Sequence, residues 1–286
     1  MKMYELQELL ENKNACMKIL DGAGVRTPKL HYSGAREGFS SSSVPAFPVV
    51  LKKVRSAGGM GVTICDTKEK MDRALGKMDG TEEIQVQEMV SGIDTSKQYF
   101  LTDDGWAPIT NTDQIIKNKV EHAGNQILSA QMDASDNQNA DRAAQKLWSM
   151  GYRGYFAVDM MKPSDGGPAR VIEVNCRAGG VTAPTSVATQ LGFSRFVNRQ
   201  FKFKDEAALL NTLESLGFKE GDREGVVPLL VIPLDDGTIK TELLCLSEAG
   251  GLDMAERAEK SAGAYARDGS ILFIGPLILM PPGRRQ

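Results

Sequence analysis

The spacing of apolar residues predicts a helix at the start of the chain. Within residues 4–20, Leu6, Leu10 and Ile19 fall close to one helical face. Two glycines shortly after this segment favour the end of the helix. The next segment, residues 34–47, is rich in small and polar residues, and this composition predicts a loop.

Apolar runs and turn residues predict strands through the middle of the chain. The expected strands cover residues 44–54, 62–66, 83–90, 98–104, 105–110, 155–161 and 169–175. Helices are expected between them, over residues 68–78 and 139–151. After residue 200 the pattern predicts one or two helices, a strand over 226–234, a helix over 250–266 and a final strand. Because hairpins are prominent, the pattern favours an α+β fold over a purely parallel sheet.

Composition narrows the class of protein. The chain has 286 residues, 41% of them hydrophobic, which is enough to bury two hydrophobic cores. Its formal net charge of −3 gives no reason to expect a nucleic acid or a membrane surface as partner. Four cysteines without metal-site or paired spacing indicate reduced thiols in a cytoplasmic protein.

A glycine-rich turn follows the first expected strand. The strand delivers Lys52 or Lys53, and the turn contains Gly58, Gly59 and Gly61. Glycine allows backbone N–H groups to approach an anion closely, and a lysine adds a positive charge for phosphate oxygens. An ordinary glycine hairpin explains the segment equally well when it is considered alone.

Oxygen-bearing side chains converge on the hairpin expected over residues 155–175. Glu173 and Asn175 are two apart on one strand and therefore point to the same face, and Asp159 lies opposite if the strands pair. Two carboxylates and an amide suit Mg²⁺. Arg177 continues on that face, where its guanidinium can hold a phosphate or a carboxylate. The alternative is the polar outer face of a half-solvated hairpin.

The strand over residues 83–90 offers a surface for a nucleotide base. The backbone groups of Gln87, Glu88, Met89 and Val90 can bind adenine, and Asp94 can accept hydrogen bonds from ribose hydroxyls. A plain sheet strand explains the same residues equally well.

In this order, the three elements resemble the ATP-grasp superfamily. The resemblance runs from Lys13 to Arg177 and is carried by PVVLKK with RSAGGMGV, then VQEMVSGID, VDMM and EVNCR. It implies that Lys13 is a second nucleotide contact and that Lys52 is the phosphate-binding lysine. Lys52 and Arg177 are the implied catalytic residues. Two positions depart from the family pattern: Gln87 stands where a Glu is frequent, and Ala157 stands where some ligases carry Arg.

The resemblance implies an ATP-grasp fold in which two α+β subdomains clamp the nucleotide. The expected parts are a helical segment over 1–33, a small lid subdomain over 34–98, a central metal- and substrate-binding subdomain over 99–200 and a C-terminal α+β region over 201–286. The usual full N-terminal α/β domain has no counterpart in these parts. Three alternatives are open: the domain is dispensable, it is supplied by a second copy of the chain or by a partner subunit, or the C-terminal region from about residue 201 replaces it.

The activity implied by the resemblance is that of a carboxylate–amine ligase. Such an enzyme uses ATP with Mg²⁺ or Mn²⁺ to form an acyl phosphate from a small carboxylic acid, which an amine or amino acid then attacks. Residues 112–127 and 174–184 resemble the peptide-forming ligases of secondary metabolism. His122 and Asn125 then orient a substrate, unless the histidine is simply solvated. An ATP-grasp kinase, a carboxylase-like enzyme and a non-catalytic ATP-binding module are the alternatives.

Overall fold

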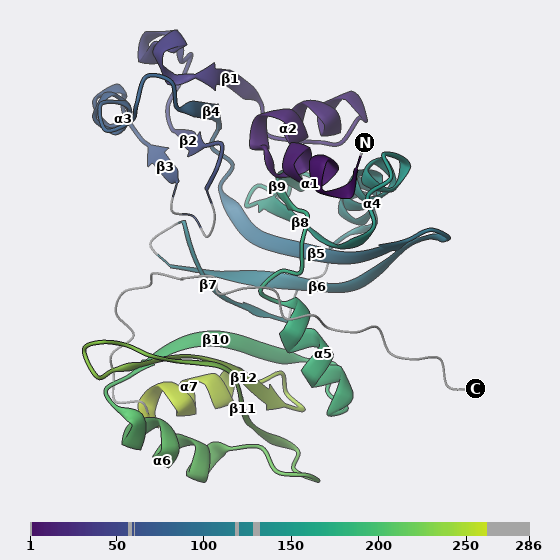
Figure 1. The fold of residues 1–286 in the computed structure, drawn as a ribbon, viewed down its shortest axis with the longest axis vertical. Helices are drawn as coiled ribbons and strands as arrows, with labels where there is room; N and C mark the ends of the chain where they lie inside the picture. Colours follow the sequence, from purple (N-terminus) through teal and green to yellow (C-terminus); the bar gives the residue numbers. More distant parts are fainter. Residues whose placement is uncertain (1, 57–58, 60, 118–119, 128–131, 262–286) are drawn as a thin grey trace.

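The structure is a computed structural model that describes residues 2–56, 59, 61–117, 120–127 and 132–261 (Figure 1). It begins with two helices, α1 (Met3–Glu11) and α2 (Lys13–Gly22). The prediction of one continuous helix over residues 4–20 is therefore wrong, because two helices occupy this segment. Asn12 adopts an extended conformation between the two helices, and its side chain caps α2 by accepting a hydrogen bond from the Ala15 N–H at 3.0 Å.

A small antiparallel sheet forms the first subdomain, with strand order β1-β4-β2-β3. Its strands are β1 (Leu30–Ala35), β2 (Val49–Lys53), β3 (Val62–Cys65) and β4 (Glu83–Glu88), and α3 (Lys68–Leu75) packs beside them. The sequence pattern does not predict β1, because its side chains lack a buried apolar face and pairing with β4 orders it. The expected loop continues from there as two short 3-10 turns, Arg36–Gly38 and Ser41–Ser43.

An eight-stranded sheet forms the rest of the described chain, with strand order β11-β12-β10-β7-β6-β5-β8-β9. All of its strand pairs are antiparallel. The strands are β5 (Gly92–Thr102), β6 (Gly105–Lys117), β7 (Glu121–Gln126), β8 (Gly154–Pro163), β9 (Arg170–Asn175), β10 (Phe196–Phe203), β11 (Glu224–Pro233) and β12 (Ile239–Ser247). Strands β7, β10 and β12 are absent from the sequence prediction, and the expected final strand lies outside the described residues.

Helices cover the large sheet at its two ends (Figure 1). Together with α1 and α2, α4 (Ala134–Ser149) packs on β5, β8 and β9, and α6 (Glu206–Leu216) and α7 (Leu252–Ser261) pack on β10 and β12. Helix α5 (Thr182–Gln190) follows β9 and lies beside β12. None of the helices in the described part of the chain is long and apolar enough to cross a membrane.

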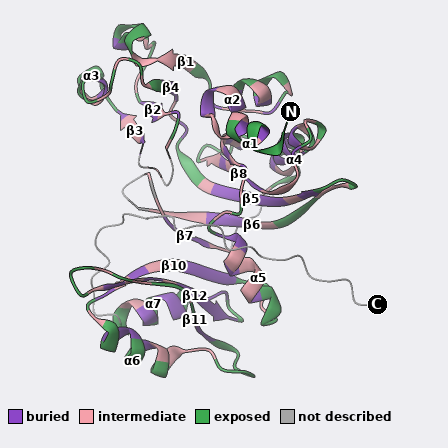
Figure 2. Ribbon diagram, in the orientation of Figure 1, coloured by how far each residue is buried: buried purple, intermediate pink, exposed green. Residues whose placement is uncertain are grey.

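Strand alternation divides the large sheet into an apolar face and a polar face. Tyr99, Phe156 and Val174 belong to the buried cluster under α1, α2 and α4 (Figure 2). Their sequence neighbours point to the opposite face, because successive strand residues alternate. The same division continues at the other end of the sheet, where Val197 and Leu243 pack under α6 and α7. One face is therefore left for polar chemistry along most of the sheet.

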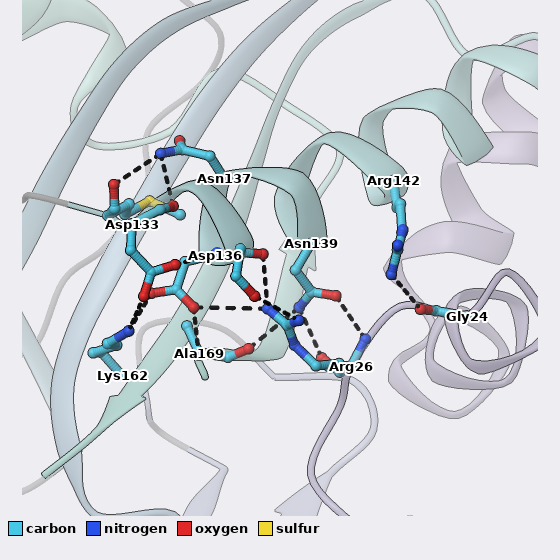
Figure 3. A network of polar contacts seen from close by, with 11 residues as sticks. Gly24, Arg26, Asp133, Asp136, Asn137, Asn139, Arg142, Lys162 and Ala169 are labelled. Carbon is cyan, nitrogen blue, oxygen red and sulfur yellow. Dashed lines mark hydrogen bonds and ion pairs between the residues drawn. The ribbon is translucent and has the colours of Figure 1, made fainter. Parts of the chain in front are cut away.

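A buried carboxylate ties the turn after α2 to the large sheet (Figure 3). Asp136, near the start of α4, accepts a hydrogen bond from the Ala169 N–H at 2.7 Å and one from the Lys162 ammonium at 2.5 Å. The Arg26 guanidinium lies 3.7 Å from the same carboxylate. Asn139 extends the network by accepting from the Arg26 N–H at 2.7 Å. This network fixes the chain segment that carries α2 against the hairpin of β8 and β9.

The domain divisions expected from the sequence fall inside strands. The division at 33/34 falls in β1, that at 98/99 in β5 and that at 200/201 in β10. Because β10 and β12 pair with each other and β10 pairs with β7, strands on both sides of residue 200 belong to one sheet. The functional division of the chain into these four parts stays a proposal.

Candidate functional site

A cavity of about 500 Å³ lies between the small sheet and the polar face of the large sheet. Strands β2 and β4 supply one wall, and β5, β8 and β9 supply the other. The cavity then continues along β6, β7, β10 and β12. The residues expected from the sequence that line it are Lys13, Lys52, Gly59, Gln87, Met89, Val90, Asp94, His122, Asn125, Asp159, Glu173, Asn175 and Arg177.

Two buried lysines face this cavity from different elements. Lys52 lies on β2, and its ammonium donates to the Ile172 carbonyl of β9 at 3.0 Å. Lys13 opens α2, and its ammonium donates to the Ser56 carbonyl at 2.7 Å, where the glycine-rich segment begins. Lys53 points to the other side of β2 and pairs with Glu82 at 2.8 Å. Strand alternation therefore selects Lys52 as the lysine that faces the cavity.

The hairpin of β8 and β9 brings the three expected metal ligands together. Asp159 is the direct cross-strand partner of Glu173, which confirms the register expected from the sequence. The Asn175 amide donates to Asp159 Oδ2 at 2.8 Å, and Gln114 of β6 donates to Asp159 Oδ1 at 2.9 Å. The Lys13 ammonium lies 3.1 Å from Glu173 Oε1. Both carboxylates are thus held by neighbouring donors in a common cluster.

Burial shifts the titration of this cluster. Burial, reinforced by the Glu173 charge, raises the pKa of Asp159 to about 7. Burial raises the pKa of Asp94 to about 6, opposed by the Lys52 charge. The pKa of Lys52 is lowered, chiefly by its own burial. Because burial disfavours the charged forms of Asp159 and Asp94, an added cation would stabilise these carboxylates.

The chemistry of this donor set fits Mg²⁺ only with oxygen atoms from elsewhere. No group of three or more His, Cys, Asp or Glu side chains with metal-binding geometry occurs in the described ranges. Asp159, Glu173 and Asn175 instead offer two carboxylates and an amide oxygen. Mg²⁺ commonly binds one or two carboxylates and completes its shell with phosphates and water. Burial opposes ionisation of Asp159, and a bound cation would stabilise its carboxylate form.

Only some side chains of the expected adenine-binding strand line the cavity. Gln87, Met89 and Val90 line it, and Asp94 follows at the start of β5. Glu88 does not line it, because its side chain forms an ion pair with Arg170 and accepts from the Lys29 N–H at 2.6 Å. Any contact of Glu88 with a base therefore falls to its backbone groups.

The glycine-rich turn is described in part. Gly59 lines the cavity with φ +82°, a conformation that favours glycine. Gly61 packs closely on the turn itself, since an added Cβ would lie 2.4 Å from the Ser56 hydroxyl oxygen. Gly58 lies outside the described residues.

Arg177 and His122 also line the cavity that contains the cluster of Asp159, Glu173 and Asn175. Arg177 lines it and pairs with Glu11 at the end of α1, with 3.3 Å between Nη1 and Oε1. Burial lowers the pKa of His122, opposed by a hydrogen bond with Asn125. His122 lies on β7 and lines the cavity, so the solvated-loop alternative for it is wrong.

Sequence reasoning missed the polar residues that continue the cavity across the sheet. Gln98 is one, and it accepts from the Thr182 hydroxyl at 2.9 Å beside Gly179. The signal that identifies Ser96 and Gln98 is the polar residue at every second position of β5, which begins with Asp94. The missed residues are Ser96, Gln98, Gln114, Asn198, Gln200, Lys240 and Glu242.

Solved structures with the same fold are numerous, and three illustrate the range. Carboxyaminoimidazole ribonucleotide synthase from Aspergillus clavatus, complexed with ATP, is 12% identical with a TM-score of 0.64, over 89% of this chain and 72% of that chain. L-amino acid ligase from Bacillus licheniformis is 14% identical with a TM-score of 0.61, over 89% and 71%. The biotin carboxylase domain of Hydrogenobacter thermophilus 2-oxoglutarate carboxylase, in complex with MgADP, ADP and bicarbonate, is 14% identical with a TM-score of 0.62, over 88% and 66%.

At these identities the similarity shows a shared fold. No curated protein sequence matches the chain. The model of the ATP-grasp domain, in contrast, matches residues 10–181. That match covers more than half of the chain and contains the lysines, the adenine-side strand and the carboxylate hairpin described above. The chain therefore belongs to the ATP-grasp family.

Proposed function

We propose that the protein is an ATP- and Mg²⁺-dependent ligase that joins a carboxylic acid to an amine. The observation that carries this proposal is the cluster in which two buried lysines, Lys13 and Lys52, meet the carboxylates of Asp159 and Glu173 in one cavity. Cations for phosphate oxygens and ligands for a divalent ion are both needed where a phosphoryl group moves between two anions.

Each residue then has a role that its position supports. Lys13 and Lys52 bind phosphate oxygens, and the backbone from Gln87 to Val90 together with Asp94 binds the nucleoside. Asp159, Glu173 and Asn175 hold Mg²⁺, which supplies neutralisation of phosphate charge when bound. Arg177 lines the same cavity as these ligands, and its guanidinium stabilises the anionic phosphoryl group during its transfer.

The reaction balances without a redox partner. A carboxylate oxygen of the acid attacks the γ-phosphorus of ATP, and the bond to ADP breaks. The amine nitrogen then attacks the acyl carbon, and phosphate leaves. The nitrogen gives up a proton in this step, and His122, whose pKa is lowered by burial, is a base that lines the same cavity.

An ATP-turnover screen tests this function. The protein is incubated with Mg²⁺-ATP and pools of carboxylic acids and amines, each alone and together, and ADP and phosphate are measured. A ligase releases both only when an acid and an amine are present. Release with bicarbonate alone indicates a carboxylase-like reaction, and ADP without phosphate indicates a kinase. Mg²⁺-dependent ATP binding without any turnover indicates a non-catalytic module and contradicts the proposal.

A further inference from the structure

The cavity does not end at the metal-ligand cluster. Beyond Gln114 it runs over Asn125 of β7, Asn198 of β10 and Glu242 of β12. Asn125 is the direct cross-strand partner of both Gln114 and Asn198. Because cross-strand partners share a face, one polar row crosses the sheet from Asp159 toward β12. A second set of polar side chains, Asn125, Asn198 and Glu242, therefore lines the same cavity as Lys13 and Lys52.

At the far end of this row, the buried Asn198 forms a hydrogen-bonded pair with the half-buried Glu242. The Asn198 amide Nδ2 donates to Glu242 Oε1 at 2.7 Å. Asn198 is only 1% exposed, and its Oδ1 has no hydrogen-bond partner among the described residues. Glu242 forms no ion pair with any residue that the structure describes. Burial raises the pKa of its carboxyl group.

Unsatisfied acceptors of this kind are costly unless a ligand completes them. A half-buried carboxylate without an ion pair among the described residues and a buried amide oxygen without a donor both lose hydration without full compensation. A primary ammonium has three N–H donors and one positive charge, so it satisfies both groups at once. The wall beside the pair is apolar, with Leu229, Leu230 and Ile232 of β11, which suits an alkyl chain.

The groups at the opposite end of the cavity, near Lys52 and Glu173, limit which ligands can bind at the Asn198–Glu242 pair. The phosphate groups and the reacting carboxylate belong near Lys52 and Glu173 under the proposed function. The part of the cavity along β10 and β12 is left for the second substrate, the amine. Neighbouring strands lie about 4.8 Å apart, and β12 is three strands beyond β6 in the sheet. A group held by Glu242 is therefore remote from the nitrogen that reacts.

We propose that the Asn198–Glu242 pair binds a protonated amine at the remote end of the acceptor substrate. The acceptor is then a diamine or another elongated primary amine whose far end is cationic. This inference rests on the proposed ligase function for the location of the reacting end. The recognition of a cation by the pair has its own test.

Calorimetry tests the binding without turnover. Linear diamines of increasing chain length are titrated into the full chain with Mg²⁺-ADP, each beside the monoamine of the same chain length. We expect one diamine length to bind about 10- to 100-fold more tightly than its monoamine, as hydrogen bonds to a charged group allow. Glu242→Gln and, separately, Asn198→Leu should remove this preference. Glu248→Gln, an exposed position after β12, is the matched control and should keep it.

Turnover separates this inference from the proposed function. With an acid identified in the ATP-turnover screen, the preferred diamine should have a lower KM than its monoamine, and Glu242→Gln should bring the ratio of the two KM values close to unity. Turnover without any diamine preference overturns the inference and leaves the ligase standing. A preference in calorimetry that Glu242→Gln abolishes, without turnover on any acid, supports the cation site and contradicts the ligase. Thermal melting of both variants checks that they fold.

Discussion

The Lys13 ammonium lies 3.1 Å from a carboxylate oxygen of Glu173, which joins the first turn of α2 to β9. The same ammonium donates to the Ser56 carbonyl at 2.7 Å. One lysine thus connects the metal-ligand hairpin to the beginning of the glycine-rich turn. If a divalent ion takes the Glu173 carboxylate, Lys13 becomes available for a phosphate oxygen. Nucleotide and metal binding should therefore be coupled.

Replacement of Glu173 tests this coupling. We expect Glu173→Gln to abolish turnover, because the neutral amide neither neutralises a metal nor bridges two of them. Asn175→Ala should weaken turnover less, since only one oxygen ligand is lost. Nucleotide binding should persist in part through Lys52. Titration of nucleotide at several Mg²⁺ concentrations measures the effect. Unchanged Mg²⁺ dependence in Glu173→Gln would exclude Glu173 as a ligand.

Replacement of Lys52 tests the phosphate-binding role. Lys52→Ala should weaken Mg²⁺-ATP binding by about 10- to 100-fold, the range for lost hydrogen bonds to a charged group. Lys53→Ala is the matched control on the same strand, because Lys53 pairs with Glu82 on the opposite face. Calorimetric titration with ATP and a thermal melt of each variant give affinity and folding separately. A larger loss in Lys53→Ala would contradict the assignment.

The sequence predicted most of the residues that line the cavity along β2, β4, β8 and β9 and few of those that line it along β10 and β12. The register of Asp159 and Glu173 followed from strand alternation and a turn-rich KPSDGGP segment, and both signals are local. Strand β10 gave no such signal. Its polar Asn198 is buried and its Gln200 is half-buried, and both are ordered by pairing with β7 and β12, which lie far away in sequence. Local patterns carry no information about such partners.

The break at Asn12 has a similar cause. The apolar spacing of residues 4–20 is compatible with one helix, and only the side-chain cap on Ala15 ends α1 and starts α2. Lys13 consequently stands in the first turn of a new helix rather than in the middle of a longer one. The correct position of this lysine therefore depends on a cap that periodicity does not reveal.

Asp94 should make stability depend on pH. Its pKa is about 6 in the folded protein, against an ordinary value of 3.8, mainly because of burial. Between these values the folded state binds more protons than the unfolded state, so stability falls as pH rises through this window. Asp94→Asn should therefore raise the stability at pH above 6 by on the order of 1 kcal/mol. The Lys52 charge opposes the effect of burial and keeps the pKa of Asp94 from rising further.

Thermal melts across a pH series measure this effect. The difference between Asp94→Asn and the unchanged protein should vanish below the unfolded pKa. Asp104→Asn, in the exposed turn between β5 and β6, is the control and should show no such trend. A difference that is constant with pH would mean that Asp94 ionises normally.

Asp136 should be a major determinant of stability. Its buried carboxylate accepts from the Ala169 N–H and pairs with Lys162 and Arg26. Asp136→Ala leaves these donors without their acceptor, and loss of one partner from a buried ion pair typically costs about 3–5 kcal/mol. Asp133→Ala, which removes the exposed cap of α4 and an exposed ion pair with the same Lys162, should cost about 1 kcal/mol. Denaturant unfolding compares the two variants. Equal costs would mean that the network contributes little beyond the cap.

The narrow junction between β7 and β10 has a consequence for how such enzymes diversify. Within the described part of the chain, three cross-strand pairs join these strands, with Asn198 at the centre. Substitutions on β10 and β12 are thus separated from the carboxylate hairpin by several strands of the same sheet. Mutational drift on the far side can change which molecule is accepted while the phosphoryl-transfer groups keep their surroundings. A directed-evolution library confined to Asn198, Gln200 and Glu242 is the natural starting point for retargeting this scaffold.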